Sequence, residues 1–362
     1  MVVKYLRKAY TNFATYIYDI PPRMLALLLI MIFALLPMTR ALDSSTLMML
    51  RDASVMAILA ASWDLLVGRT GQMSLGHALF IGIGGYSSAL LFMHFGWPVW
   101  MVIPVSMLAG AVVALLIGLP CLRVKGSYLA LLTLAFPLLL ERAVYYFRDV
   151  TKAEEGIPPP PRLPAFFQGL IRLDARIAEY YLTLSLMVIS AIILYKIANS
   201  KRGMVFVSIL DDELASKACG INVTNYKLLA FVISGLFASL SGCVAVYISS
   251  FANPSFFGIR WSVLPLVVTI FGGIGTIYGP IVGTYIYYFL DMYVFRKIIN
   301  ISEWHYFGLT WEYATFLIFI LIVIIFILKW PRGIARAVVE KLEDLEEARP
   351  IEELEQKMAK AD

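Results

Sequence analysis

Some of the ionisable residues within long apolar segments could hold charge or move protons inside a membrane: Asp64, His77, Glu141, Arg142 and Asp291. Ionisable groups at this depth usually face the protein interior. For Glu141 and Arg142 two interpretations stay open, an ion pair with another helix or a wall of a solute path. His77 is predicted to be a hydrogen-bonded structural residue, with a proton relay or ligand as the alternative. Asp64 and Asp291 lie near the ends of their segments and are expected to reach the polar interface.

Several kinds of chemistry lack the residues that they need. The sequence has no midplane series of Asp, Glu and His of the kind that proton-coupled carriers use. It has no G-x-x-x-x-G-K-[ST] phosphate loop, no H-E-x-x-H sequence and no paired-carboxylate site. Cys121, Cys219 and Cys243 lack the paired spacing of a disulfide framework or a zinc site. We therefore expect no enzyme, metal or bound cofactor, and any energy for transport must come from another protein.

The apolar runs are long enough to cross a membrane. The chain is 60% hydrophobic and only 15% charged, which is outside the range of soluble globular proteins. A bilayer core of about 30 Å requires about 20 apolar residues in a helix. We predict an all-α polytopic membrane protein of ten helices, some short or broken. The predicted spans are 24–39, 46–66, 73–94, 98–119, 127–147, 180–198, 228–250, 262–274, 278–294 and 312–330.

The charges predict an orientation and three regions. Loops predicted to lie inside hold about twice as many Lys and Arg residues as those predicted outside, which places both termini in the cytoplasm. The basic, tyrosine-rich leader 1–23 is expected to form an interfacial helix. A transmembrane domain, 24–330, and a charged cytoplasmic tail, 331–362, follow. The net charge of +5 reflects the inside bias, and no basic patch interleaved with aromatics indicates nucleic-acid binding.

The polar loop 201–227 lies between two strongly apolar segments. Its middle, Ile209–Gly220, is predicted to be a short helix with acids in its first turns and a glycine stop. Those residues are Asp211, Asp212, Glu213 and Gly220. Ala215 and Ala218 are three apart and share a small face. A short helix outside the bilayer buries little of its own surface, so we expect it to contact another protein.

Small residues at a spacing of four predict faces where helices approach closely. One such face lies in Gly71–Tyr86, another at Ser234, Ala238 and Gly242, and a third at Gly275, Gly279 and Gly283. Two roles remain open for these faces: helix packing, or lining a solute path. The candidate residues in the first two thirds of the chain are Gly71, Ser74, Gly76, His77, Gly82, Gly126, Tyr128, Thr133, Glu141 and Ser234.

Residues 262–294 are too many for one span and are interrupted by GGIGTIYGP at 272–280. Pro280 lacks an amide hydrogen and opposes a continuous helix. Such a break at membrane depth requires that the backbone be buried in protein or line a wet cavity. We predict two short spans joined by a tight turn, whose candidate residues are Gly272, Gly273, Gly275, Gly279 and Pro280.

Four segments of the chain resemble the permease subunits of branched-chain amino acid ABC importers. They are GQMSLGHALFIGIGGY (71–86), VKGSYLALLTLAF (124–136), DDELASKACGINVTNYKLLAF (211–231) and FGGIGTIYGP (271–280). The segments occur in the family's order and cover most of residues 55–290. Together they are highly specific.

The resemblance implies an all-α permease subunit in a prokaryotic inner membrane. It implies as partners a second, similar permease, two cytoplasmic ATPase subunits and an external solute-binding protein. ATP and magnesium would then be bound by the ATPase subunits and not by this chain. It also implies that 211–220 is the coupling helix, with Glu213, Ala215, Ala218 and Gly220 on the family's loop pattern.

One departure from the family leaves the solute open. After the fifth helix the family tends to have Thr-Gly-Gly, then an acidic residue and Gly, whereas residues 151–157 here read TKAEEGI and four prolines follow. Importers of urea and short amides share much of the pattern. An alternative from another class is an ion-coupled secondary carrier acting alone, which the lack of buried charge pairs weakens.

Overall fold

The computed structural model describes residues 43–124, 126–157, 175–249, 251–298, 311–329 and 333. The chain divides into two units, 1–48 and 49–362, and the contacts below lie within the second. The regular elements of the described residues are all helices, and the one extended pairing among these residues is a β-bridge between Ile157 and Ala252. The leader 1–23, the first predicted span and, except for Gly333, the tail 331–362 lie outside the described residues.

Nine of the ten predicted spans coincide with helices. They are α3 (Ser44–Thr70), α4 (His77–Phe95), α5 (Val99–Cys121), α6 (Ser127–Tyr146), α9 (Ala175–Ala198), α12 (Val223–Ser249), α13 (Arg260–Gly272), α14 (Tyr278–Phe289), which continues as the π-helical η4 (Leu290–Ile298), and α15 (Trp311–Lys329). Shorter elements are α7 (Arg148–Thr151), η2 (Ala153–Glu155), α10 (Lys201–Asp211), α11 (Glu213–Ala218) and η3 (Pro254–Phe257). Among the described residues, α4, α5, α6, α9 and α12 are long and apolar enough to cross a membrane. The prediction of an all-α polytopic membrane protein is confirmed.

Helix α12 packs along both α4 and α5 and is buried over most of its length. Small residues permit this approach: a Cβ at Gly84 would collide with the backbone of Ser239, and one at Gly242 with the backbone of Ile81. Ser239 Oγ also donates to the Phe80 carbonyl at 3.0 Å. Gly242, a member of the predicted small face of α12, is therefore a packing contact.

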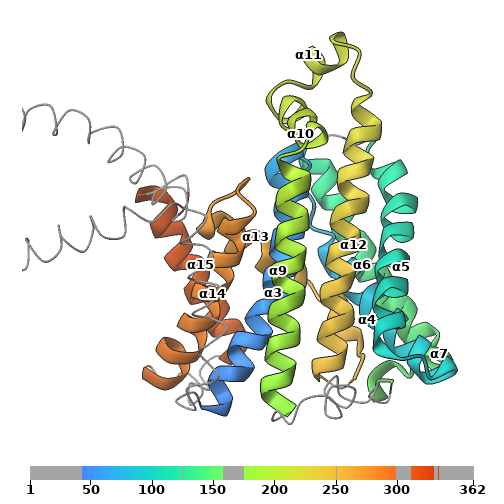
Figure 1. Ribbon diagram of the computed structural model, residues 1–362, viewed down its shortest axis with the longest axis vertical. Helices are drawn as coiled ribbons and strands as arrows, with labels where there is room; N and C mark the ends of the chain where they lie inside the picture. The colour runs from blue at the N-terminus through green and yellow to red at the C-terminus, as the bar shows by residue number, and fades with distance from the viewer. Residues whose placement is uncertain are drawn as a thin grey trace, which may run out of the picture. The chain divides into compact units, whose positions relative to one another are not determined.

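The two ends of the helix bundle differ. Figure 1 shows α10 and α11 at one end of the bundle, beyond the end of α9, and α7 at the opposite end. The loops 147–179 and 201–227 thus begin at opposite ends, as the predicted alternation of spans requires.

Helices α13 and α14 lie where two short spans were predicted and pack on each other. A Cβ at Gly272 would collide with the Gly279 carbonyl, and one at Gly283 with the Val268 carbonyl. Pro280 lies in the first turn of α14, where a missing N–H costs no helical hydrogen bond. Gly275 does not share the glycine face with Gly279 and Gly283, because it lies in the non-helical turn with a φ of 80°.

A bulky residue at this contact should destabilise the protein. A Cβ at Gly279 would meet the carbonyl oxygen of Gly273, so we expect Gly279→Leu to lower the free energy of unfolding by about 1–3 kcal/mol. Thermal unfolding of the purified protein in detergent measures this loss. The control Ile281→Leu nearly conserves volume and should be close to wild type. Equal stability of the two variants would show that close approach is not required.

Candidate functional site

Residues 71–76, between α3 and α4, are not helical. Gly71 has a φ of 69°. The Trp63 indole Nε1 donates to the Ser74 carbonyl at 2.9 Å, and the Leu75 N–H donates to Thr133 Oγ1 at 3.0 Å. These side chains replace helical hydrogen bonds. The span predicted over 73–94 would place His77 several residues inside a helix, and this is wrong, because α4 begins at His77.

His77 is a fully buried link between three helices. Its Nε2 lies 2.8 Å from Ser234 Oγ on α12, and that hydroxyl donates to the Ser62 carbonyl on α3 at 2.8 Å. Because the Ser234 hydrogen points to Ser62, the hydroxyl accepts from Nε2, so Nε2 holds the imidazole hydrogen. The next residue, Ala78, donates its N–H to Ser262 Oγ on α13 at 3.1 Å. His77 thus has the hydrogen bond that its structural interpretation predicts.

Asp64 on α3 is fully buried and holds the turn between α13 and α14. Its Oδ1 accepts the Gly275 N–H at 2.5 Å and its Oδ2 accepts the Ile277 N–H at 2.9 Å. Gly273, Gly275 and Ile277 in this turn have positive φ values, whereas residues of a right-handed helix have negative φ values. The expectation that Asp64 reaches the polar interface is wrong, because the backbone donors of the turn meet it inside the protein. Asp291 is buried too.

The predicted helix 209–220 is in fact two helices, α10 and α11. Asp212 ends the first and caps the second: its Oδ1 accepts the N–H groups of Leu214 at 2.8 Å and Ala215 at 3.0 Å. Asp211 is the last residue of α10. Gly220 follows α11 with a φ of 81°, in agreement with its predicted role as a stop.

Glu213 fixes α11 to the start of α12. Its Oε1 pairs with Lys217 Nζ within α11, and its Oε2 pairs with Lys227 Nζ on α12, both at 2.7 Å. The hydrogen bonds from Lys217 and then Lys227 lower the pKa of Glu213 to about 2. The Lys227 carbonyl accepts from Gln72 Nε2 at 3.2 Å, and the same nitrogen donates to Thr70 Oγ1 at 2.9 Å. One polar chain therefore joins α11, α12 and the segment 71–76.

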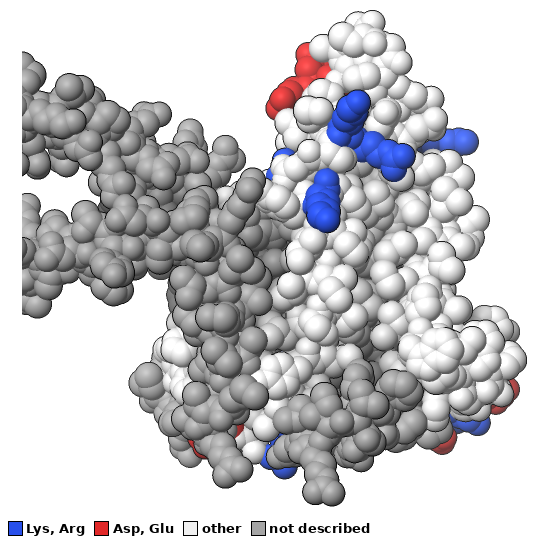
Figure 2. Space-filling view, in the orientation of Figure 1, with Lys and Arg blue, Asp and Glu red and all other residues white. Residues whose placement is uncertain are grey.

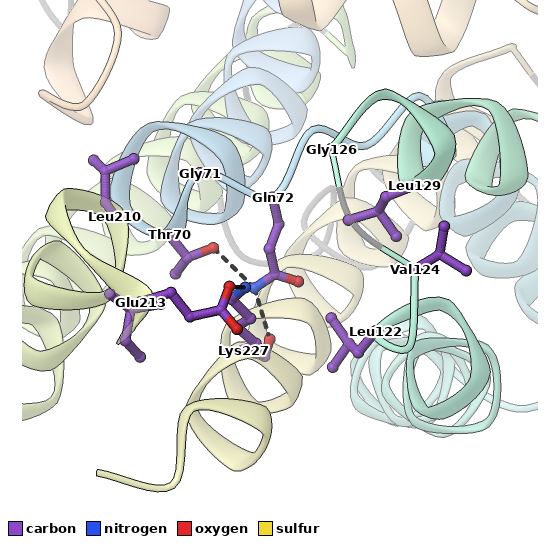
Figure 3. A pocket seen from close by; sticks show the side chains of 11 residues that line it. Thr70, Gly71, Gln72, Leu122, Val124, Gly126, Leu129, Leu210, Glu213 and Lys227 are labelled. Carbon is purple, nitrogen blue, oxygen red and sulfur yellow. Dashed lines mark hydrogen bonds and ion pairs between the residues drawn. The ribbon is translucent and has the colours of Figure 1, made fainter. Parts of the chain in front are cut away.

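A cavity of about 300 Å³ lies beside this chain. It is lined by Thr70, Gly71, Gln72, Leu122, Val124, Gly126, Leu129, Ile209, Leu210, Glu213 and Lys227. In Figure 3, Gln72 lies between the Glu213–Lys227 pair and the apolar wall formed by the α5–α6 connection. Three predicted residues that are distant in sequence, Gly71, Gly126 and Glu213, meet here.

The other predicted residues fall into separate groups. Ser74, Gly76, His77, Thr133 and Ser234 form the buried cluster at the start of α4. Gly82 packs against the Phe257 ring, and the five candidates at 272–280 form the α13–α14 junction. Ala215 and Ala218 are exposed on α11.

Tyr128 and Glu141 lie on α6 outside these groups, Tyr128 exposed and Glu141 partly buried. Neither Glu141 nor Arg142 forms an ion pair with another residue in the described ranges. The expectation that the protein lacks buried charge pairs is wrong. Arg51 on α3 and Glu179 on α9 form an ion pair at 2.8 Å, and both side chains are largely buried.

Sequence analysis missed Gln72 and Lys227 and misplaced Asp64. The Glu213–Lys217 pair has a local signal, the i,i+4 spacing of opposite charges on a helix. Lys227 and Gln72 have none, because the contacts depend on how α11, α12 and the segment 71–76 meet. Asp64 had a weak signal, since a carboxylate in an apolar segment requires buried partners.

The fold and the site define a class: a multi-pass helical membrane protein with broken spans and a short polar helix pair at one end. The family model of the branched-chain amino acid transport system permease component matches residues 45–328. The chain belongs to this family.

Individual relatives agree with that assignment. The high-affinity branched-chain amino acid transport system permease protein LivM of Salmonella typhimurium and that of Escherichia coli are each 28% identical over 239 residues. Each match covers 60% of this chain and 56% of the relative, so the chain spans little more than half the length of these proteins. The ribose import permease protein RbsC of Haemophilus influenzae is 24% identical over 264 residues, covering 71% of this chain and 78% of the relative. No solved structure matches the chain significantly.

The attachment of α11 should not depend on pH near neutrality. Because the pKa of Glu213 is lowered from 4.5 to about 2, its stabilising effect is complete above about pH 4.5 and is lost as the pH falls through about 2. In Glu213→Gln, loss of both ion pairs should cost about 1 kcal/mol, so α11 amides should exchange about five-fold faster.

Hydrogen–deuterium exchange of α11, corrected for intrinsic rates, measures both effects. Wild type should show constant protection between about pH 5 and pH 8. The control Asp211→Asn removes a neighbouring charge and should leave α11 unchanged. Equal exchange in Glu213→Gln and wild type would contradict this role of Glu213.

Proposed function

We propose that this chain is the permease subunit of an ATP-driven importer that moves a small polar solute into the cytoplasm. Membership of the permease family supports this proposal. The observation that carries it is the helix pair α10–α11, which presents an exposed face at one end and is fixed to α12 by the Glu213–Lys227 pair.

In this proposal α11 is the coupling helix. Its exposed face includes Leu214, Ala215 and Ala218, and Leu214 is 74% exposed although it is apolar. An ATPase subunit would dock on this face and move α11. The Glu213–Lys227 pair would transmit the movement to α12, and the bond from Gln72 to the Lys227 carbonyl would transmit it to the segment that precedes α4.

The proposed assembly holds a second, similar permease, two ATPase subunits and an external solute-binding protein, in the inner membrane of a prokaryotic cell. ATP and magnesium would be bound by the ATPase subunits, and this chain would bind no cofactor. Both termini would lie in the cytoplasm, on the same side as α11.

Branched-chain amino acids are the solute that the family description and the LivM relatives favour. The similarity to a ribose permease supports the coarser statement of a small polar solute. Urea and short amides remain the alternative because of the departure at 151–157. Uptake assays should therefore compare leucine, urea and ribose.

Affinity purification of the tagged chain from its own cells, followed by mass spectrometry, tests the assembly. We expect an ATPase, a second permease and a solute-binding protein. Membrane vesicles that contain the complex should take up leucine only with ATP and the binding protein. Uptake by this chain alone in proteoliposomes, driven by an ion gradient, would instead establish a secondary carrier.

A bulky charge on α11 should uncouple ATP hydrolysis by the ATPase subunit from solute uptake. Ala218 is exposed, so Ala218→Arg should insert and fold normally, yet the guanidinium would hold the ATPase away from α11. We expect uptake to fall by about ten-fold or more at normal expression, since a loss of about 1.4 kcal/mol in docking free energy weakens binding ten-fold. Thr224→Arg adds the same charge at an exposed position of α12 and should retain transport. Normal uptake by the Ala218→Arg variant would show that α11 is not the coupling helix.

The native cysteines can test the orientation. Cys219 follows α11 and is exposed, whereas Cys121 and Cys243 are buried. A membrane-impermeant maleimide should label Cys219 in inverted vesicles and fail to label it in intact cells, because the basic loops favour the cytoplasm. Cys219→Ser provides the unlabelled control. Labelling in intact cells with protection in inverted vesicles would reverse the proposed orientation.

A further inference from the structure

A second cavity, of about 490 Å³, lies where α9, α10 and α12 meet. It is lined by Ile193, Lys196, Ile197, Ser200, Lys201, Arg202 and Ile233. Six of its lining residues belong to two chemical groups. Three isoleucines form an apolar wall, and two lysines and an arginine form a basic rim. We call it the α9–α10 groove.

No described residue neutralises the three cations of the groove. Lys196, Lys201 and Arg202 are exposed, and none forms an ion pair with another described residue. The amino-terminal end of α10 begins at Lys201, with Ser200 as its cap, and adds the positive end of a helix dipole. Figure 2 shows Lys and Arg side chains gathered over the end of α9 and the start of α10, above an uncharged face.

The order of these groups along α9 matches the depth profile of a bilayer. α9 is apolar enough to span and ends at Ala198, so its last turn lies at the level of the headgroups. Ile193 and Ile197 are four apart and share a face. Ile193 lies about one turn deeper than Lys196 and Ile197, so the apolar wall extends toward the hydrocarbon and the cations lie at the surface.

We propose that the α9–α10 groove binds an anionic glycerophospholipid. The phosphate and headgroup contact Lys196, Lys201 and Arg202, and one acyl chain lies along Ile193, Ile197 and Ile233. Basic pockets between helices at a membrane surface bind anionic lipid in this way. A free phosphate would use the cations but leave the apolar wall uncovered, so the lipid is the occupant that accounts for both. The proposal requires only that this end of α9 lies at a bilayer surface, and it does not depend on the solute or the partners.

Lipid titration of the full, delipidated chain in detergent, followed by native mass spectrometry, tests the proposal. Phosphatidylglycerol should bind at least about ten-fold more tightly than phosphatidylcholine, because a headgroup without net charge gains little from the cations. Each single change, such as Arg202→Gln, should weaken phosphatidylglycerol binding by about five-fold, and the three changes together by on the order of 100-fold. The control Arg123→Gln removes an exposed base that lies outside the groove and should bind as wild type.

Three results would overturn the proposal. Equal binding of the two lipids would show that the groove does not recognise the headgroup. Full retention of phosphatidylglycerol by the triple variant would show that the lipid binds at another site. Displacement of the lipid by an equal concentration of inorganic phosphate would show an anion site instead. If the triple variant fails to fold, the phosphatidylglycerol affinity of the single variant Arg202→Gln decides between these outcomes. Ile193→Ser tests the wall separately and should weaken lipid binding without changing helix content.

Discussion

The structure depends on one constraint: a backbone N–H or carbonyl inside a membrane protein must have a hydrogen-bond partner within the protein. Two interruptions of helix, at 71–76 and 273–277, release such groups inside the bundle. In the second, the buried Asp64 carboxylate accepts the N–H groups of Gly275 and Ile277. In the first, Trp63 and Thr133 bond the backbone of Ser74 and Leu75. The breaks are stable because side chains of neighbouring helices replace the lost helical bonds.

These interruptions create the connections on which the proposed function rests. Because α4 begins only at His77, the segment before it can bend toward α12, and Gln72 can reach the Lys227 carbonyl. Lys227 in turn pairs with Glu213 of α11. A continuous helix from residue 71 would not expose its backbone to Trp63 and Thr133. The helix break and the polar attachment of α11 are thus parts of one arrangement.

Sequence reasoning recovered the features that local patterns determine. Hydrophobic length located nine helices, the glycines and Pro280 located the α13–α14 turn, and Gly220 located the end of α11. It did not recover features that depend on contacts distant in sequence. Asp64 and Ile277 are 213 residues apart, and no local pattern specifies that pairing. The break at Asp212 also escaped prediction, because a run of acids fits the first turn of one helix as well as a cap between two.

The measurement that tests this account most directly is the stability of Asp64 variants, followed by thermal unfolding and by hydrogen–deuterium exchange across 273–277. Asp64→Ala leaves the N–H groups of the buried Ile277 and the partly buried Gly275 unpaired. We therefore expect a loss of about 2–5 kcal/mol and rapid exchange confined to the turn. Asp64→Asn keeps one carbonyl acceptor and should lie between Asp64→Ala and wild type. If Asp64→Ala is as stable as wild type and its turn exchanges at the same rate, the buried carboxylate does not hold the break, and the account is wrong.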